Sequence, residues 1–197
     1  MKRETMTPRE RWLAVLTRRT PDRVPMDWWG TGEAFRKLQQ HLNCDDPLGK
    51  LHVDTCAFVH PRYVGPALPQ GGDEFGCRFR NVEYGTGVYR ECIHHPLTAF
   101  ESVADIERQY TWPTPDWWAH DEIHTQIAGK EDRPIRGGGS EPFLQYCQLR
   151  GQEQAFMDLV LNPDMVHYCL DKLFNLAYEN TRRIYEAVPG KVMITYV

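Results

Sequence analysis

Short β-forming runs alternate with longer helical segments along this chain, and this alternation restricts the fold more than any other feature. Apolar, β-branched and aromatic residues gather at 24–28, 55–59 and 192–197, and the short run 133–136, which ends in a stretch of glycines, is a fourth candidate strand. Helical patterns separate these runs, and a strand–helix–strand order is typical of a mostly parallel sheet covered by helices. The sequence therefore predicts an α/β fold whose four strands are parallel neighbours.

The helical segments carry recognisable start signals. Thr7 and Glu10 form a capping-box pattern, and Ser102 and Asp105 repeat it, so a helix is expected after each. Asp116 is expected to cap a helix that runs to residue 129. Further helices are expected around 35–42, from 46 to 51, and from 162 to 188, where apolar residues recur every three or four positions.

Residues 77–93 follow a different pattern. Two alternating runs flank the segment Tyr84–Gly87, which contains two glycines. Alternation on both sides of a glycine turn is typical of a β-hairpin. We therefore expect a hairpin inserted beside the main strand–helix repeat.

Composition excludes several classes of protein. The chain is 41% hydrophobic and 25% charged, with a net charge of −4 and no basic cluster, which argues against nucleic acids and membranes as partners. The N-terminus is charged, and no apolar run approaches the ~20 residues of a membrane span, so a cytoplasmic location is expected. Six cysteines without C-x-x-C spacing are expected to be reduced thiols.

The four predicted strands are half the number found in an eight-stranded α/β barrel. An eight-stranded α/β barrel takes ~250 residues, so four strands in 197 residues correspond to about half of one. The sequence also stops within the β-forming run 192–197. We therefore expect residues 1–197 to form a single incomplete barrel domain, and we expect the unpaired edge of its sheet to promote association.

A series of short motifs supports this interpretation. They are MTPRERWLAVL (6–16), PDRVP (21–25), LHVD (51–54), DEFG (73–76), HPL (95–97), WP (112–113), GGS (138–140), LRG (149–151) and NPD (162–164). In this order and spacing they resemble the N-terminal half of uroporphyrinogen decarboxylase superfamily proteins, and the resemblance covers essentially all 197 residues.

The resemblance implies a partial (β/α)8 TIM-type barrel, with the first four parallel strands and a hairpin insertion. It implies a parent enzyme that is either a decarboxylase, a lyase of porphyrin biosynthesis, or a corrinoid- or coenzyme-M-linked methyltransferase. The substrate would be a corrinoid, a tetrapyrrole or a small methylated compound. The decarboxylases use no cofactor, whereas a full-length methyltransferase relative would bind zinc through residues largely in the second half. No cofactor is expected in this chain.

Asp54 is the principal candidate for a catalytic residue. The resemblance places it where the decarboxylases carry an aspartate that binds the pyrrole N–H groups of the substrate. A carboxylate that enters an apolar strand is costly to bury unless it is paired. We expect it at the C-terminal mouth of the strands, near the loops of Trp28 and Gly138. The alternative is a turn cap or an ion pair with Arg62.

Four further residues are candidates for substrate binding. The decarboxylases carry arginines after the first strand, whereas this chain has Trp28 and Trp29, which argues against uroporphyrinogen itself as the substrate. The alternative for both tryptophans is packing. Tyr146 is expected either to orient a ligand or to lie in the core. Gly138 belongs to a glycine run that either cradles an anion through backbone N–H groups or packs tightly against a helix.

Two patterns resemble metal sites but predict none. His120 and His124 share a helix face if the expected helix forms, but the glutamate is out of place for a zincin and no third ligand is evident. In the run from Cys92 to His95, alternating strand directions are expected to make the side chains diverge. The remaining alternative for the whole chain is a non-catalytic half-barrel that associates with a partner chain or with itself.

Overall fold

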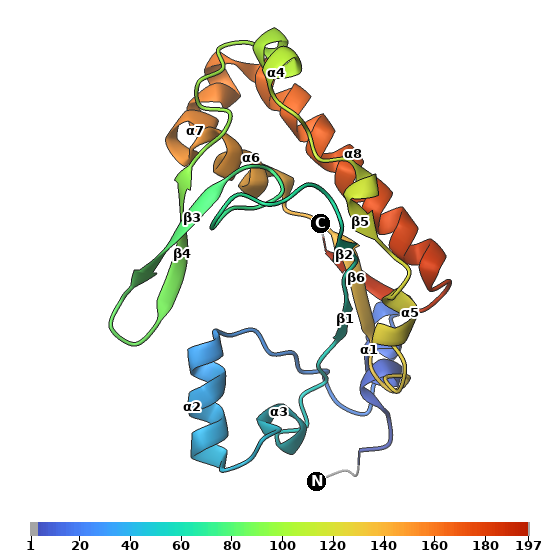
Figure 1. The fold of residues 1–197 in the computed structure, drawn as a ribbon. Coiled ribbons are helices and arrows are strands. Elements are labelled where there is room, and N and C mark those ends of the chain that lie inside the picture. The colour runs from blue at the N-terminus through green and yellow to red at the C-terminus, as the bar shows by residue number, and fades with distance from the viewer. Residues whose placement is uncertain (1–3, 197) are drawn as a thin grey trace. The chain divides into compact units, whose positions relative to one another are not determined.

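A computed structural model describes residues 4–196 (Figure 1). The chain divides into two compact units. The first unit comprises Met1–His60, Asp121–Gly137 and Tyr185–Thr195, and the second comprises Pro61–His120, Gly138–Ile184 and Tyr196–Val197. Within the described part, no helix combines the length and apolar character needed to cross a bilayer.

The first unit is organised around a three-stranded sheet. Its strands are β1 (Ala57–Val59), β6 (Ile135–Gly139) and β7 (Val192–Tyr196), in the order β1-β6-β7. Strands β1 and β6 are parallel, with Ala57 opposite Ile135 and Val59 opposite Gly137. The predicted α/β class is therefore confirmed, and three of the four predicted strands lie in this sheet. Val197, the last residue of the fourth predicted run, lies outside the described residues.

The strand predicted at 24–28 is wrong. These residues form no strand, because their backbone N–H groups are used elsewhere or missing. Pro25 has no N–H to donate. The N–H of Met26 donates to the Asp54 carboxylate at 2.9 Å, and that of Trp28 donates to the Asp27 carboxylate at 2.9 Å.

The helices of the first unit are α1 (Pro8–Leu16), α2 (Gly32–Leu42), α3 (Pro47–Lys50) and α5 (Ile123–Gln126). Two of them, α1 and α3, begin where the capping signals predict. Thr7 and Glu10 form the predicted capping box of α1, and Asp46 caps α3. These ends form from local contacts, which explains why sequence alone located them.

The second unit contains two antiparallel pairs and most of the helical structure. The predicted hairpin is confirmed as β3 (Arg78–Glu83) and β4 (Val88–His94). A second pair joins β2 (Arg62–Tyr63) to β5 (Trp118–Ala119). The helices are α4 (Val103–Gln109), α6 (Pro142–Arg150), α7 (Gln152–Leu161) and most of α8 (Pro163–Ala187), which Figure 1 shows as one long rod.

The helix predicted from Asp116 to residue 129 is also wrong. The segment forms a 3-10 turn (Pro115–Trp117) and then β5, and the short helix α5 begins only at Ile123. The Tyr63 ring lies edge-on to the rings of Trp117 and Trp118, with centroids 6.4 Å and 5.8 Å away. Tertiary packing onto β2 therefore overrides the local preference for helix.

Candidate functional site

Asp54 does not lie where it was predicted. It precedes β1 by three residues, whereas Gly138 lies toward the carboxyl end of β6. Because β1 and β6 are parallel, Asp54 is at the amino end of the sheet and Gly138 is not. The predicted position at the C-terminal mouth is wrong, because Asp54 precedes β1, just as it precedes the predicted strand 55–59.

The Asp54 carboxylate is enclosed by donors of its own chain. Its side chain is 1% exposed and forms a close ion pair with Arg11. Arg23 donates to it at 2.6 Å and the Met26 N–H at 2.9 Å. Ion pairing, the kind of contact given by one expected alternative, is therefore present, with Arg11 and Arg23 as partners. A carboxylate with this many donors is held in a fixed position.

Arg11 joins two carboxylates and is itself 1% exposed. Its Nε donates to Asp22 at 2.6 Å, and a terminal nitrogen donates to the Met6 carbonyl at 2.7 Å. The Arg11 hydrogen bond is the largest influence on the pKa of Asp22, which is held well below its usual range, and backbone N–H groups including that of Met6 lower it further. We call Arg11, Asp22, Arg23 and Asp54 the Arg11 network.

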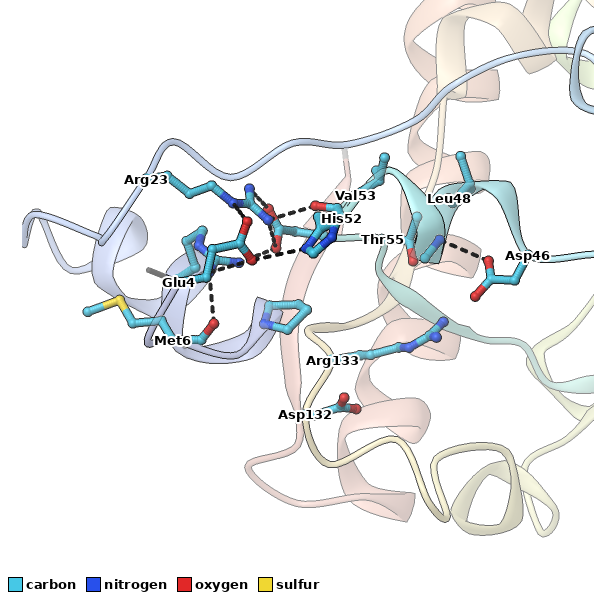
Figure 2. A pocket seen from close by; sticks show the side chains of 14 residues that line it. Glu4, Met6, Arg23, Asp46, Leu48, His52, Val53, Thr55, Asp132 and Arg133 are labelled. Carbon is cyan, nitrogen blue, oxygen red and sulfur yellow. Dashed lines mark hydrogen bonds and ion pairs between the residues drawn. The ribbon is translucent and has the colours of Figure 1, made fainter. Parts of the chain in front are cut away.

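Arg11, Arg23 and Asp54 of the Arg11 network line a polar cavity of about 300 Å³ in the first unit. Figure 2 shows Arg23, Glu4 and His52 gathered on one side of it, with Asp132 and Arg133 on another. Arg23 donates to Glu4 at 2.9 Å, and the His52 Nδ1 lies 3.4 Å from the same carboxylate. The cavity therefore offers charges of both signs, many of them already paired.

The glycines at the end of β6 serve tight packing. Gly138 and Gly139 have φ values of +72° and +89°. A Cβ on Gly138 would lie 2.6 Å from the Thr181 side chain of α8. The Gly139 N–H donates to the Thr181 hydroxyl at 3.0 Å, and the Ser140 N–H donates to the Tyr196 carbonyl at 3.0 Å. These contacts fit the packing alternative, and the N–H groups of Gly139 and Ser140 are occupied within the chain.

Replacing Gly139 with alanine is expected to destabilise the chain severely. A Cβ there would lie 1.7 Å from the Tyr196 carbonyl oxygen, and the backbone is in the left-handed region that favours glycine. We expect loss of the cooperative thermal transition in circular dichroism. Gly190→Ala, at a similar φ of +68° but with open space around the Cβ position, is the matched control. Equal melting temperatures for the two variants would contradict this account.

Tyr146 lies in the core of the second unit. It is fully buried in α6, and its hydroxyl donates to Asp158 at 2.7 Å. Arg150 donates to the same carboxylate oxygen at 2.7 Å. Gln154 and Asn162 each donate to the other oxygen at 2.8 Å. Of the two roles expected for Tyr146, its position fits the core role.

Asp158 makes the stability of the fold depend on pH in the acidic range. Burial raises its pKa, but hydrogen bonds from Arg150, Asn162, Gln154 and Tyr146 outweigh burial and lower it to about 2. A carboxyl group with a folded-state pKa below its unfolded value of about 4 stabilises the fold above pH ~4, and this stabilisation is lost as pH falls toward 2. Urea unfolding at pH 5 and pH 2.5 should show a smaller loss in Asp158→Asn than in the wild type. Equal losses would contradict this.

The two tryptophans differ in their environments. Trp28 is half-buried and covers Gly30, whose Cβ position would be 2.8 Å from the indole ring. Trp29 is 100% exposed. Neither lies in the sheet, and their predicted contact with substrate stays a prediction.

The expected divergence of the side chains from Cys92 to His95 is wrong. The chain turns after β4, so that the Cys92 Sγ lies 3.6 Å from the His95 Nδ1. Both groups, with the Cys77 thiol, contact the Gln148 carbonyl of α6, at 3.7, 2.6 and 3.4 Å. They therefore satisfy one of the carbonyls left open at the end of this helix.

The helix face expected to carry His120 and His124 does not form, because His120 precedes α5 and only His124 lies in it. Among residues 4–196, no group of three or more His, Cys, Asp or Glu side chains is arranged to hold a metal ion.

The carboxyl end of β1 carries a residue that sequence reasoning missed. His60 directly follows the strand and is exposed, and its ring is stacked on that of Phe58. The signal was present in the sequence, since His60 closes the predicted strand run 55–59.

The fold and these clusters define a mixed α/β protein with a small parallel sheet. Comparisons with protein-family models, curated proteins and solved structures find no match for the chain.

Proposed function

We propose that this chain forms part of a (β/α)8 barrel of the uroporphyrinogen decarboxylase superfamily. The observation that carries the proposal is the sheet, in which β1, β6 and β7 are neighbours in chain order and β1 and β6 are parallel. Successive strands of such a barrel have this arrangement. The proposed location is cytoplasmic.

The family-like motifs support the proposal because their residues contact one another. Arg11, Asp22 and Asp54 come from three different motifs and meet in the Arg11 network. In the second unit, the Leu97 N–H of the HPL motif donates to the Leu149 carbonyl of the LRG motif at 2.9 Å. These motifs therefore connect, through hydrogen bonds, segments that are distant in the sequence.

The proposed activity is decarboxylation or methyl transfer on a corrinoid, a tetrapyrrole or a small methylated substrate. Chemistry in such barrels takes place at the carboxyl ends of the strands. We place the substrate there, rather than in the cavity at the amino end, because that cavity is lined by the Arg11 network, whose carboxylates already have arginine partners. The absence of arginines around Trp28 favours methyl transfer or a less carboxylated tetrapyrrole over uroporphyrinogen decarboxylation.

A binding panel tests the proposal. Purified chain is titrated with uroporphyrin, hydroxocobalamin and methylthioethanesulfonate, as representatives of the three substrate classes, and binding is followed by equilibrium dialysis. Binding of at least one probe at micromolar to submillimolar concentration is expected. Failure of all three to bind above the level of an unrelated protein would contradict the proposed function.

The alternative function is a half-barrel that pairs with a partner chain or with itself. Within residues 4–196, β1 and β7 are the edges of the sheet. Unpaired edges of a parallel sheet are templates for intermolecular pairing. Light scattering on purified chain is expected to give a mass above that of a monomer at micromolar concentration. A monodisperse monomer that binds a probe would favour the enzymatic proposal over this alternative.

A further inference from the structure

We propose that His60 contacts the substrate at the carboxyl end of β1 and that Gln126 is its positioning residue. The proposal rests on the proposed function, because it takes the carboxyl ends of the strands as the place of chemistry. His60 is the first residue after β1, which ends at Val59. Asp54, at the other end of the strand, is enclosed by the Arg11 network.

Gln126 holds the backbone of His60 at two points. The His60 N–H donates to the Gln126 side-chain oxygen at 2.9 Å, and the Gln126 amide nitrogen donates to the His60 carbonyl at 2.8 Å. Gln126 ends α5, which is anchored by the fully buried Ile123. A side chain that satisfies both backbone groups of one residue fixes the direction in which that residue projects.

The imidazole ring is also held from the side. It is parallel to the Phe58 ring within 5°, with centroids 6.1 Å apart. Phe58 is 50% exposed, although its neighbours Ala57 and Val59 are buried. Alternate residues of a strand share a face, so Phe58 and His60 lie on the exposed face of β1.

Arg136 brings a positive charge near this face of β1. Arg136 is opposite Phe58 in the strand register, with its guanidinium carbon 5.4 Å from the centroid of the Phe58 ring. The pKa of Cys56 is raised to about 11, mainly by burial and also by Asp27, while Arg136 opposes the rise. The face thus combines an aromatic surface with a held imidazole, whose two ring nitrogens can take part in hydrogen bonds with a ligand.

Because the His60 ring is exposed, packing of the fold does not require a histidine at this position. An exposed ring contributes little to stability, so His60→Gln is expected to keep the wild-type melting temperature within the usual range of surface substitutions. Loss of one hydrogen bond to a ligand typically weakens binding by about tenfold.

The test uses the full chain and the three probes of the binding panel. His60→Gln is expected to weaken binding of the bound probe about tenfold. Gln126→Ala is expected to weaken it by a smaller factor. His41→Gln, at an exposed histidine of α2, is the control and should leave binding unchanged. In NMR spectra, the ring signals of His60, but not those of His41, should shift when the probe is added, and a purely structural role would not cause this.

The outcomes are separable. If a probe binds but His60→Gln binds equally well and the His60 ring signals do not move, the inference is overturned and the proposed function stands. If no probe binds, the proposed function fails and the inference fails with it.

Discussion

Replacing Arg11 with leucine is expected to lower the free energy of unfolding by about 3–5 kcal/mol, the range for breaking a buried ion pair by removing one partner. The substitution leaves Asp54, 1% exposed, without its most buried cation, and removes a donor from Asp22 and from the Met6 carbonyl. Urea unfolding at pH 7, followed by circular dichroism, measures the change.

The control for Arg11 is Arg80→Leu. Arg80 pairs with Glu91 at 2.6 Å on the hairpin, but both side chains are exposed. Exposed pairs contribute about 0–1 kcal/mol, so this variant should be close to the wild type. Similar losses in the two variants would show that the Arg11 network does not stabilise the fold as described. Asp54→Asn should also be strongly destabilised, contrary to the small effect expected of a pocket residue.

Replacing Asp158 with alanine is expected to cost about 3–5 kcal/mol for the same reason. Asp158 is fully buried and accepts hydrogen bonds from four side chains, so its loss leaves Arg150 and Tyr146 without their shared acceptor. Tyr146→Phe removes only one donor and should cost about 0.5–1.5 kcal/mol.

Thermal and urea unfolding measure how much stability Asp158→Ala and Tyr146→Phe each lose relative to the wild type. A larger loss in Tyr146→Phe than in Asp158→Ala would contradict the assignment of Asp158 as the centre of the cluster. Binding of a probe that is abolished in Tyr146→Phe, at unchanged stability, would instead restore the ligand-orienting role of Tyr146.

Features formed by neighbouring residues could be predicted from sequence. The capping box of Thr7 and the hairpin around Gly85 depend on contacts over a few positions, and both are present. Features decided by distant contacts could not be predicted. The strand β5 forms because Trp117 and Trp118 pack on Tyr63, more than 50 positions away.

The same limit applies to the candidate site. The sequence order already places Asp54 before the predicted strand 55–59 and His60 after it, and the pocket position expected for Asp54 followed from the family resemblance alone. The pairing of Arg11 with Asp54 spans 43 positions, and no local pattern indicates it. Arg11 lies three residues before Ala14 and so shares a helix face with it in α1, and this is the signal that could have suggested a buried charge.

Hydrogen exchange with a bound probe tests most directly where the substrate lies. Exchange is measured by mass spectrometry on the chain alone and with whichever probe binds in the panel. We predict new protection of the backbone at 57–60 and 135–137, around Phe58 and His60 at the carboxyl end of β1. Protection confined to 4–23 and 46–55, around the cavity of the Arg11 network, would contradict the placement of the substrate at the carboxyl ends of the strands.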